Sequence, residues 1–252
     1  MRLKDKVAIV TGGGVGIGRA YALGLAKEGA RVVVADIQEA EAEKVAGEIR
    51  QQDGEALAVP VDVTSTEKTR AMAEAALKKY GCIDVLINNA GLYTAIKKQP
   101  FLEIPVEEWD RVMAVNVKGL FLCAQAVYPA MKGQGKGKII NISSGTALGG
   151  TPFFLHYVSS KAAVIGFTRA LAREVGPDNI CVNAITPGLT ISGPQQEGVL
   201  TPEQLADRRR RRCFQRDQYP QDLVGTVVFL ASADSDFMTG QTINVDGGTN
   251  MH

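Results

Sequence analysis

Residues 7–18 read VAIVTGGGVGIG, an apolar run that leads directly into a glycine-rich turn and the start of a helical pattern. In a βαβ unit this order sets the amino terminus of the helix against a diphosphate. Glycines there let the backbone turn tightly, approach the phosphates and pack the helix on the sheet. We therefore predict a dinucleotide site, although a glycine cluster alone also fits a tight surface turn. The residues expected to contact the dinucleotide here are Gly12, Gly14, Gly16, Ile17 and Gly18.

Short β-branched runs alternate with longer helical patterns along the chain. Most of these runs are apolar throughout, which is typical of strands covered on both faces of a parallel sheet. We expect an α/β fold, a doubly wound and mainly parallel seven-stranded sheet with helices on both faces in three layers, and ligands at the carboxyl ends of the strands. The expected strands are Val7–Thr11, Val32–Asp36, Ala56–Val61, Ile83–Asn88, Lys138–Ile142, Cys181–Ile185 and Thr242–Val245. The expected helices cover residues 17–28, 39–52, 66–80, 107–132, 157–175, 202–213 and 221–231.

Asp36 ends the second expected strand, 18 residues after Gly18. An acidic residue at this place binds a ribose 2′-hydroxyl, and its carboxylate repels a 2′-phosphate. Neither Val15 nor Ile37 supplies a cation that would hold such a phosphate. The pattern favours NAD over NADP, with a solvated strand end as the alternative interpretation of Asp36.

Polar and small residues also end the third and fourth expected strands. Asp62 and Val63 follow the third, and Asp62 can accept a hydrogen bond from an adenine amino group. Asn89, Ala90 and Gly91 follow the fourth and offer a small, polar backbone close to the ribose. Each of these sites taken alone also fits an ordinary turn or helix cap.

Tyr157 and Lys161 are four residues apart on an expected helix and so lie on one face of it. A nearby ammonium stabilises a phenolate, which lowers the tyrosine pKa from its reference value of about 10 toward the useful range. Ser144 follows the strand Lys138–Ile142, and its hydroxyl can hold a substrate oxygen beside the phenol. These three residues predict an acid/base site, whereas an isolated Tyr/Lys pair also fits a solvated helix face.

Taken together, the motifs resemble the short-chain dehydrogenase/reductase family in its compact single-domain, Rossmann-type form. The resemblance covers essentially the whole chain. It rests on TGGGVGIG, Asp36, Asp62-Val63, NNAG, Asn116, ISS with Ser144, YVSSK and the PG after the sixth expected strand.

The resemblance assigns a role to each matching position. Tyr157 becomes the acid/base, Ser144 orients the substrate oxygen, and Lys161 binds the ribose and eases ionisation of the tyrosine. Asn116 becomes the fourth catalytic residue, whose backbone distortion holds a water between Lys161 and solvent. The implied reaction is reversible hydride transfer between a secondary alcohol or ketone and nicotinamide, and the implied assembly is a homotetramer.

A further segment of the resemblance starts at Pro187-Gly188 and closes over the nicotinamide. The positions that hold the carboxamide in the family are Thr190 and Ser192 in this chain. The second is usually threonine, and serine keeps the hydroxyl. Residues 189–219 are the expected substrate lid of a single domain that spans residues 1–252.

The side chains that the resemblance sets around the substrate are mainly apolar, which favours an apolar or aromatic alcohol or ketone over a polyol. Several of them also fit core or subunit packing. They are Leu92, Tyr93, Ile96, Thr146, Leu148, Phe153, Phe154, Leu189 and either Leu200 or Phe214.

Residues Arg208 to Arg212, with Arg216 nearby, form the strongest local charge of the chain. Guanidinium groups can bind a carboxylate or phosphate on the substrate. Five consecutive residues wrap around a helix, however, so we favour a solvated helix face. His156 points away from the helix face of Tyr157, and we expect a packed or surface histidine with no chemical role.

The composition excludes several other classes. The 28 Lys and Arg against 27 Asp and Glu leave a net charge of +1, which predicts neither nucleic-acid nor membrane binding. The four cysteines form no CxxC pair, so no metal site is expected and a reducing, cytoplasmic setting is favoured. The apolar run near the amino terminus is too short for a signal peptide or a spanning helix.

Two other functions fit parts of the pattern. A nucleotide-binding regulator of the same fold would lack turnover, and the presence of Ser144, Tyr157, Lys161 and Asn116 argues against it. Sugar epimerases and dehydratases share the glycine loop and the Tyr/Lys pair, but they carry an added carboxyl-terminal domain. Little sequence follows the seventh expected strand here.

Overall fold

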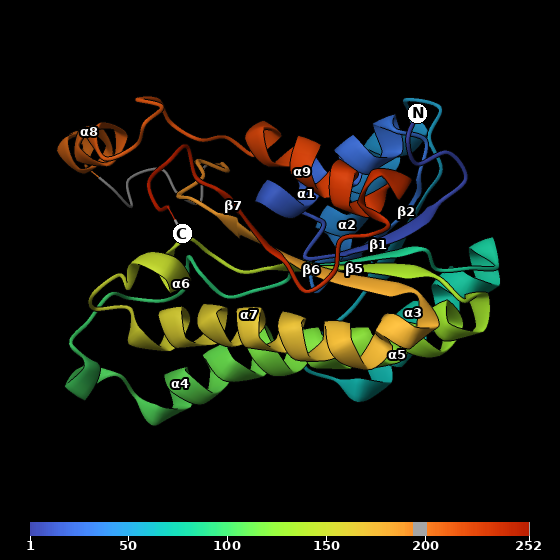
Figure 1. Ribbon diagram of the computed structural model, residues 1–252, viewed down its shortest axis with the longest axis horizontal. Helices are drawn as coiled ribbons and strands as arrows, with labels where there is room; N and C mark the ends of the chain where they lie inside the picture. The colour runs from blue at the N-terminus through green and yellow to red at the C-terminus, as the bar shows by residue number, and fades with distance from the viewer. Residues whose placement is uncertain (194–200, 252) are drawn as a thin grey trace.

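The computed structural model describes residues 1–193 and 201–251 and has seven parallel strands in one sheet, in the order β3-β2-β1-β4-β5-β6-β7 (Figure 1). The chain order reverses between β1 and β4, and this reversal is where ligands bind in doubly wound folds. The predicted fold class is confirmed. The strands are β1 (Val7–Thr11), β2 (Arg31–Asp36), β3 (Ala56–Pro60), β4 (Val85–Asn88), β5 (Gly137–Ile142), β6 (Ile180–Pro187) and β7 (Thr242–Val245).

Helices cover both faces of the sheet (Figure 1). One face packs against α1 (Gly16–Lys27), α2 (Glu39–Arg50) and α9 (Gln221–Ala231), and the other against α3 (Thr66–Tyr80), α5 (Gly119–Gln134) and α7 (Leu155–Val175). Successive strand residues point to opposite faces, as Val32 and Val33 do, so both faces of each strand must be apolar. This explains why the strands read as continuous apolar runs.

Local signals explain several helix ends. The Ser65 side chain accepts a hydrogen bond from the amide of Lys68 at the start of α3, and Gly81 ends that helix with a φ of 81°. Helix α8 (Pro202–Arg210) begins with a reciprocal capping box between Thr201 and Gln204. It ends three residues earlier than the expected 202–213, and part of the predicted lid, residues 194–200, lies outside the described residues.

The predicted helix 107–132 differs most from the structure. It is a helical run in three parts, which are α4 (Val106–Met113), a π-helical segment Ala114–Lys118 and α5. The π segment widens the helix around Asn116, a feature that concentrates at functional sites. Periodicity did not reveal it because one extra residue in a turn hardly changes an apolar pattern. A four-residue helix, α6 (Thr146–Gly149), was also not predicted.

The same run is the one candidate membrane span among the described residues. Val106–Gln134 is long and apolar enough by length and composition, and 44% of its most apolar window is buried. Core helices pass the same test. Here α4 packs on α7, and α5 packs on α3 and the sheet, so we interpret the run as a core helix.

The crossing of α1 and α9 offers a test of the packing. A β-carbon at Gly24 would lie 2.4 Å from Val224 Cγ1, so Gly24→Ala should lower the free energy of unfolding by about 1–3 kcal/mol. Val224→Ala removes the opposing methyl groups, and the double variant should lose less than the sum of the two single losses. Urea unfolding at one protein concentration measures all three values. Additive losses would contradict direct contact at this crossing.

Candidate active site

A cleft of about 1550 Å³ runs along the carboxyl ends of the strands. It lies at the edge where the topology predicts a ligand. Every residue that the sequence assigned to the cofactor lines this cleft, and of the four predicted catalytic residues only Asn116 does not. The cofactor residues are Gly12, Gly14, Gly16, Ile17, Gly18, Asp36, Asp62, Val63, Asn89, Ala90, Gly91, Tyr157, Lys161, Pro187, Gly188, Thr190 and Ser192.

The glycine turn is held by close backbone contacts and by one asparagine. A β-carbon at Gly18 would lie 1.9 Å from the Gly12 carbonyl oxygen, so helix α1 sits directly on the turn. The Asn89 amide nitrogen donates to the carbonyls of Thr11 and Gly12, at 3.0 Å each. Asn89 therefore supports the loop, which is a structural role that the sequence did not predict for its side chain.

The amino terminus of α1 fits a diphosphate. Among the described residues no side chain caps this helix, and its first turn holds no acidic residue. Its first amides therefore remain available to an anion. Gly14 and Gly16 line the cleft beside these amides, and the lack of side chains leaves room for phosphates.

Asp36 lies at the end of β2, next to the glycine turn. Its carboxylate accepts hydrogen bonds from the Gly14 amide at 2.9 Å and the Gln38 amide at 3.0 Å. These amides fix the carboxylate at the cleft wall, where it is 5% exposed. Asp62 accepts from the hydroxyl and amide of Thr64, which hold the pKa of Asp62 below its ordinary range, so it is ionised at neutral pH.

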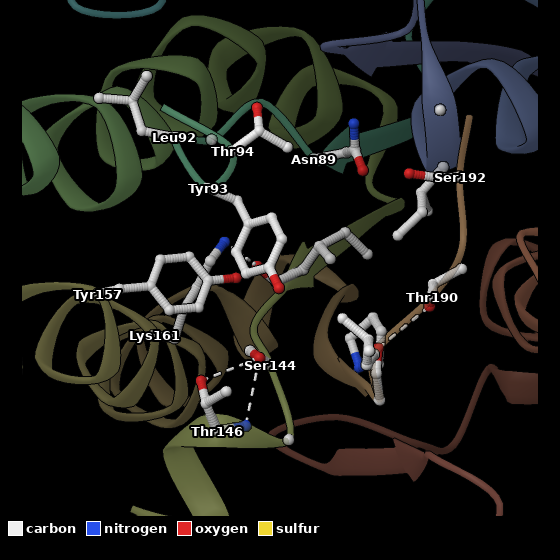
Figure 2. A pocket seen from close by; sticks show the side chains of 18 of the residues that line it. Asn89, Leu92, Tyr93, Thr94, Ser144, Thr146, Tyr157, Lys161, Thr190 and Ser192 are labelled. Atoms are coloured by element: carbon white, nitrogen blue, oxygen red, sulfur yellow. Dashed lines mark hydrogen bonds between the residues drawn. The ribbon is translucent and has the colours of Figure 1, made fainter. Parts of the chain in front are cut away.

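Tyr157 and Ser144 meet in the middle of the cleft. Tyr157 comes from the first turn of α7, and Ser144 follows β5 (Figure 2). Burial raises the pKa of the Tyr157 phenol, nearby Tyr93 raises it further, and a hydrogen bond with Ser144 lowers it. Thr146 donates to the Ser144 oxygen from both its amide and its hydroxyl, which orients that oxygen.

Lys161 lies one helical turn after Tyr157 and is 5% exposed. Its ammonium donates to the Ile142 carbonyl at 2.9 Å and lies 5.8 Å from the centre of the Tyr157 ring. Burial lowers the pKa of Lys161 to about 8. The sequence predicts that this lysine draws the phenol toward ionisation. Desolvation of both groups opposes that effect, and the protein's own groups hold Tyr157 as a neutral phenol at neutral pH.

Asn116 lies behind the cleft at the centre of the π-helical segment. Its side chain accepts from the Leu92 amide at 2.7 Å and donates to the Leu92 carbonyl and to Ser160 Oγ. Ser160 in turn donates to the Tyr157 carbonyl. Asn116 thus joins the loop after β4 to the helix that carries Tyr157, and these contacts are direct ones between protein groups.

Thr190 and Ser192 lie on the segment after β6, across the cleft from Tyr157 (Figure 2). The Thr190 hydroxyl donates to the Gly188 carbonyl at 3.1 Å. Ser192 lies farther along, where a β-carbon on Gly16 would be 3.3 Å from its hydroxyl oxygen. The two side chains therefore face different parts of the cleft, Ser192 being next to the glycine turn.

The expected substrate residues divide into two groups. Leu92, Tyr93, Thr146, Phe153, Phe154 and Leu189 line the cleft. Ile96 instead packs in the buried cluster around Phe154, Leu148 is not a lining residue, and Phe214 borders a second hollow beside Gly247. Leu200 lies outside the described residues. The direction of a loop side chain is difficult to predict from sequence because loops have no periodicity.

His156 is fully buried and its Nε2 lies 2.8 Å from Glu108 Oε1 on α4. It is a packed histidine, as expected, and not a surface one. The solvated-face interpretation of the arginine run is wrong for Arg212, which is 7% exposed and donates to the carbonyls of Leu189 and Arg216.

Lys98 also lines the cleft, although the sequence did not identify it as a site residue. A lysine in an irregular loop belongs to no sequence pattern that would indicate such a role.

Comparison with known proteins identifies the family. A family model described as "Enoyl-(Acyl carrier protein) reductase" matches residues 13–250. The chain belongs to the short-chain dehydrogenase/reductase family. It is 40% identical over 247 residues to the "Probable galactose dehydrogenase GalD" of Rhizobium meliloti (strain 1021), covering 98% of this chain and 95% of that protein.

Two further members differ in their substrates. The chain is 37% identical to the "3-oxoacyl-[acyl-carrier-protein] reductase FabG" of Thermotoga maritima, over 98% of this chain and 99% of that one. A solved 7α-hydroxysteroid dehydrogenase, complexed with NADH and 7-oxo glycochenodeoxycholic acid, superimposes with a TM-score of 0.93. It is 36% identical and covers 100% of this chain and 97% of its own. Membership of the family makes the present chain an oxidoreductase and implies a nicotinamide cofactor.

The lowered pKa of Lys161 predicts a pH-dependent stability. Between about pH 8 and 10 the unfolded chain keeps a proton on Lys161 that the folded chain has released. The free energy of unfolding of the native protein, relative to that of Lys161→Met, should therefore rise by about 1–2 kcal/mol between about pH 7.5 and 9.5. This increase should be lost again as the pH falls through 8. Urea unfolding at each pH measures the difference, with the exposed Lys44→Met as control. A constant difference would contradict the lowered pKa.

Proposed function

We propose that the protein is an NAD-dependent oxidoreductase that interconverts a secondary alcohol and its ketone, with Tyr157 as acid/base. The observation that carries this proposal is the meeting of Tyr157, Ser144 and Lys161 in one cleft whose other end holds Asp36 and the open amino terminus of α1. A regulator that only binds nucleotide would have no need for this buried acid/base group.

The chain's own residues account for the proton chemistry. A bound nicotinamide supplies the hydride donor or acceptor. The neutral phenol of Tyr157 can give its proton to a ketone oxygen during reduction and take it back during oxidation. Ser144 donates a hydrogen bond to the same oxygen, since its own oxygen is held by Thr146. Lys161 provides a cation whose charge state changes near pH 8, close to the phenol.

The walls near Tyr157 support an apolar or aromatic substrate. Tyr93, Phe154 and Tyr157 form a cluster in which Phe154 stacks on Tyr157 at 4.7 Å between ring centres. Such a surface favours a flat or apolar substrate body over a polyol. By analogy with the family we further propose that one nucleotide-binding and catalytic unit, with its lid near residues 189–219, assembles as a cytoplasmic homotetramer.

Tyr157→Phe tests the catalytic assignment. Loss of the hydroxyl should lower kcat at least about a hundredfold while the Kd for NAD stays within about twofold. Absorbance of the reduced nicotinamide measures turnover on aromatic, alicyclic, steroid and polyol alcohols and the matching ketones. Tyr93→Phe, which removes a neighbouring phenol, should keep most activity. Full activity of Tyr157→Phe would refute the assignment, and NAD binding without turnover on any substrate would favour a regulator.

Asp36→Ala tests the cofactor preference. The change removes the charge that repels a 2′-phosphate, so the ratio of kcat/KM with NAD to that with NADP should fall at least about tenfold. Asp62→Ala, the matched control, should weaken both cofactors equally. Arg19 at the cleft is ion-paired with Glu48, whereas Lys44 is exposed, so adding Lys44→Met should reverse part of the gain with NADP. An unchanged ratio in Asp36→Ala would show that the ribose contact is wrong.

A further inference from the structure

The arginine-rich segment separates into paired and unpaired side chains. On α8 and just after it, Arg209 lies 3.1 Å from Asp217, and Arg210 and Arg211 lie 3.7 and 2.9 Å from Asp207. Arg216 forms two contacts with Asp222. With the buried Arg212 bound to backbone carbonyls, five of the six arginines have local partners.

Arg208 is the exception. It lines the cleft, and within residues 1–193 and 201–251 no carboxylate lies at ion-pair distance from it. The positive charge of Arg208 lowers the pKa values of Tyr93 and Lys98, although burial has the larger effect on both. The guanidinium is therefore near two groups of the substrate end of the cleft.

Lys98 brings a second cation to the same place from the loop before residues 101–103. Its ammonium lies 5.7 Å from the centre of the Phe154 ring, which is the ring that stacks on Tyr157. Lys98 also lines the cleft and also has no carboxylate partner in the described part of the chain. Two like charges thus line the same part of the cleft, and Lys98 lies one aromatic ring away from the phenol of Tyr157.

The remaining carboxylates of the cleft do not neutralise this pair. Asp36, Glu41 and Asp62 belong to the nucleotide end, where Glu41 lies beside Gly14. Asp207 is engaged by Arg210 and Arg211. Glu203 is exposed at the first turn of α8, where it interacts with its own amide and with Thr201. Lys98 and Arg208 line the same cleft and repel one another electrostatically, and a bound anion would relieve this repulsion.

We propose that Lys98 and Arg208 form an anion subsite that binds a carboxylate or phosphate on the substrate while the ketone or alcohol lies at Tyr157. The substrate then has an apolar body against Phe154 and Tyr93 and an anionic tail. This inference rests on the proposed oxidoreductase function and extends it to a substrate class. A guanidinium and an ammonium at one site offer paired donors and a point charge to the same anion.

Aryl ketones that share one carbonyl and differ only in the para substituent test this subsite. The probes are 4-acetylbenzoate, 4-acetylphenyl phosphate and the neutral 4-acetylbenzamide, reduced with the preferred cofactor. Longer oxo-carboxylates extend the series if the tail must reach farther. We expect kcat/KM for at least one anion to exceed that of its neutral amide about tenfold or more. Comparison of kcat/KM for 4-acetylbenzoate with that for 4-acetylphenyl phosphate distinguishes carboxylate recognition from phosphate recognition.

Three variants localise the effect. Arg208→Gln and Lys98→Gln should each raise KM for the anionic ketone about tenfold, with kcat and the amide ketone little changed. Arg209→Gln removes the same charge from the adjacent residue of α8, which does not line the cleft, and should change neither substrate. Arg208→Glu should reverse the preference toward a trimethylammonium analogue.

A binding measurement separates this inference from the oxidoreductase proposal. Calorimetry of the native protein with NAD, under which a ketone cannot be reduced, gives the affinity for each probe. If no ketone turns over yet 4-acetylbenzoate or the phosphate binds and loses affinity in Arg208→Gln, the subsite is supported and the oxidoreductase proposal fails. The subsite would be overturned if the anionic probes and the amide had equal kcat/KM and equal Kd values. It would also be overturned if Arg208→Gln and Arg209→Gln lost equal affinity for the anionic probes.

Discussion

The site depends on the close approach of helix α1 to the end of β1. The Gly12 carbonyl fills the space that a β-carbon at Gly18 would need, and Asn89, just after β4, donates to the carbonyls of Thr11 and Gly12. These contacts bind two adjacent strands and one helix into a single corner. Because the corner leaves the first amides of α1 open to the cleft, the same packing that completes the fold also creates the end of the site that fits a diphosphate.

At the other end of the cleft, burial competes with charge. Tyr157 and Lys161 are both nearly excluded from water, so desolvation favours the neutral form of each group. The phenol thereby keeps its proton at neutral pH, as the proposed proton donor must. Asn116 has a positioning role, because from the π-helical segment its side chain forms hydrogen bonds with both Leu92 and Ser160. The helix that carries Tyr157 is in this way tied to the loop that borders the substrate.

Most secondary structure followed from the pattern of apolar residues, because a parallel strand buried on both faces must be apolar throughout. The seven strands were found within two residues of their expected starts and ends. The helix over 106–134 was expected as one regular element, since a single π-helical turn leaves the apolar pattern almost intact. The side chains of Ile96 and Phe214 were misplaced because loops have no repeat from which a direction can be inferred, and Leu148 lies on the four-residue helix α6, which was not predicted.

The sequence by itself determined the fold class and the spacing that sets the two candidate catalytic side chains of α7 on one face. Strand and helix periods are local properties, and Tyr157 and Lys161 share a helix face by spacing alone. Only the tertiary structure decided which charges remain unpaired. Arg208 and Lys98 are far apart in the chain. Asp207 pairs with Arg210 and Arg211 at helical spacing, but the partners of Arg209 and Arg216 lie at distances along the chain that follow no helical or strand period. Charge pairing depends on distances in space, which no linear spacing between loops determines.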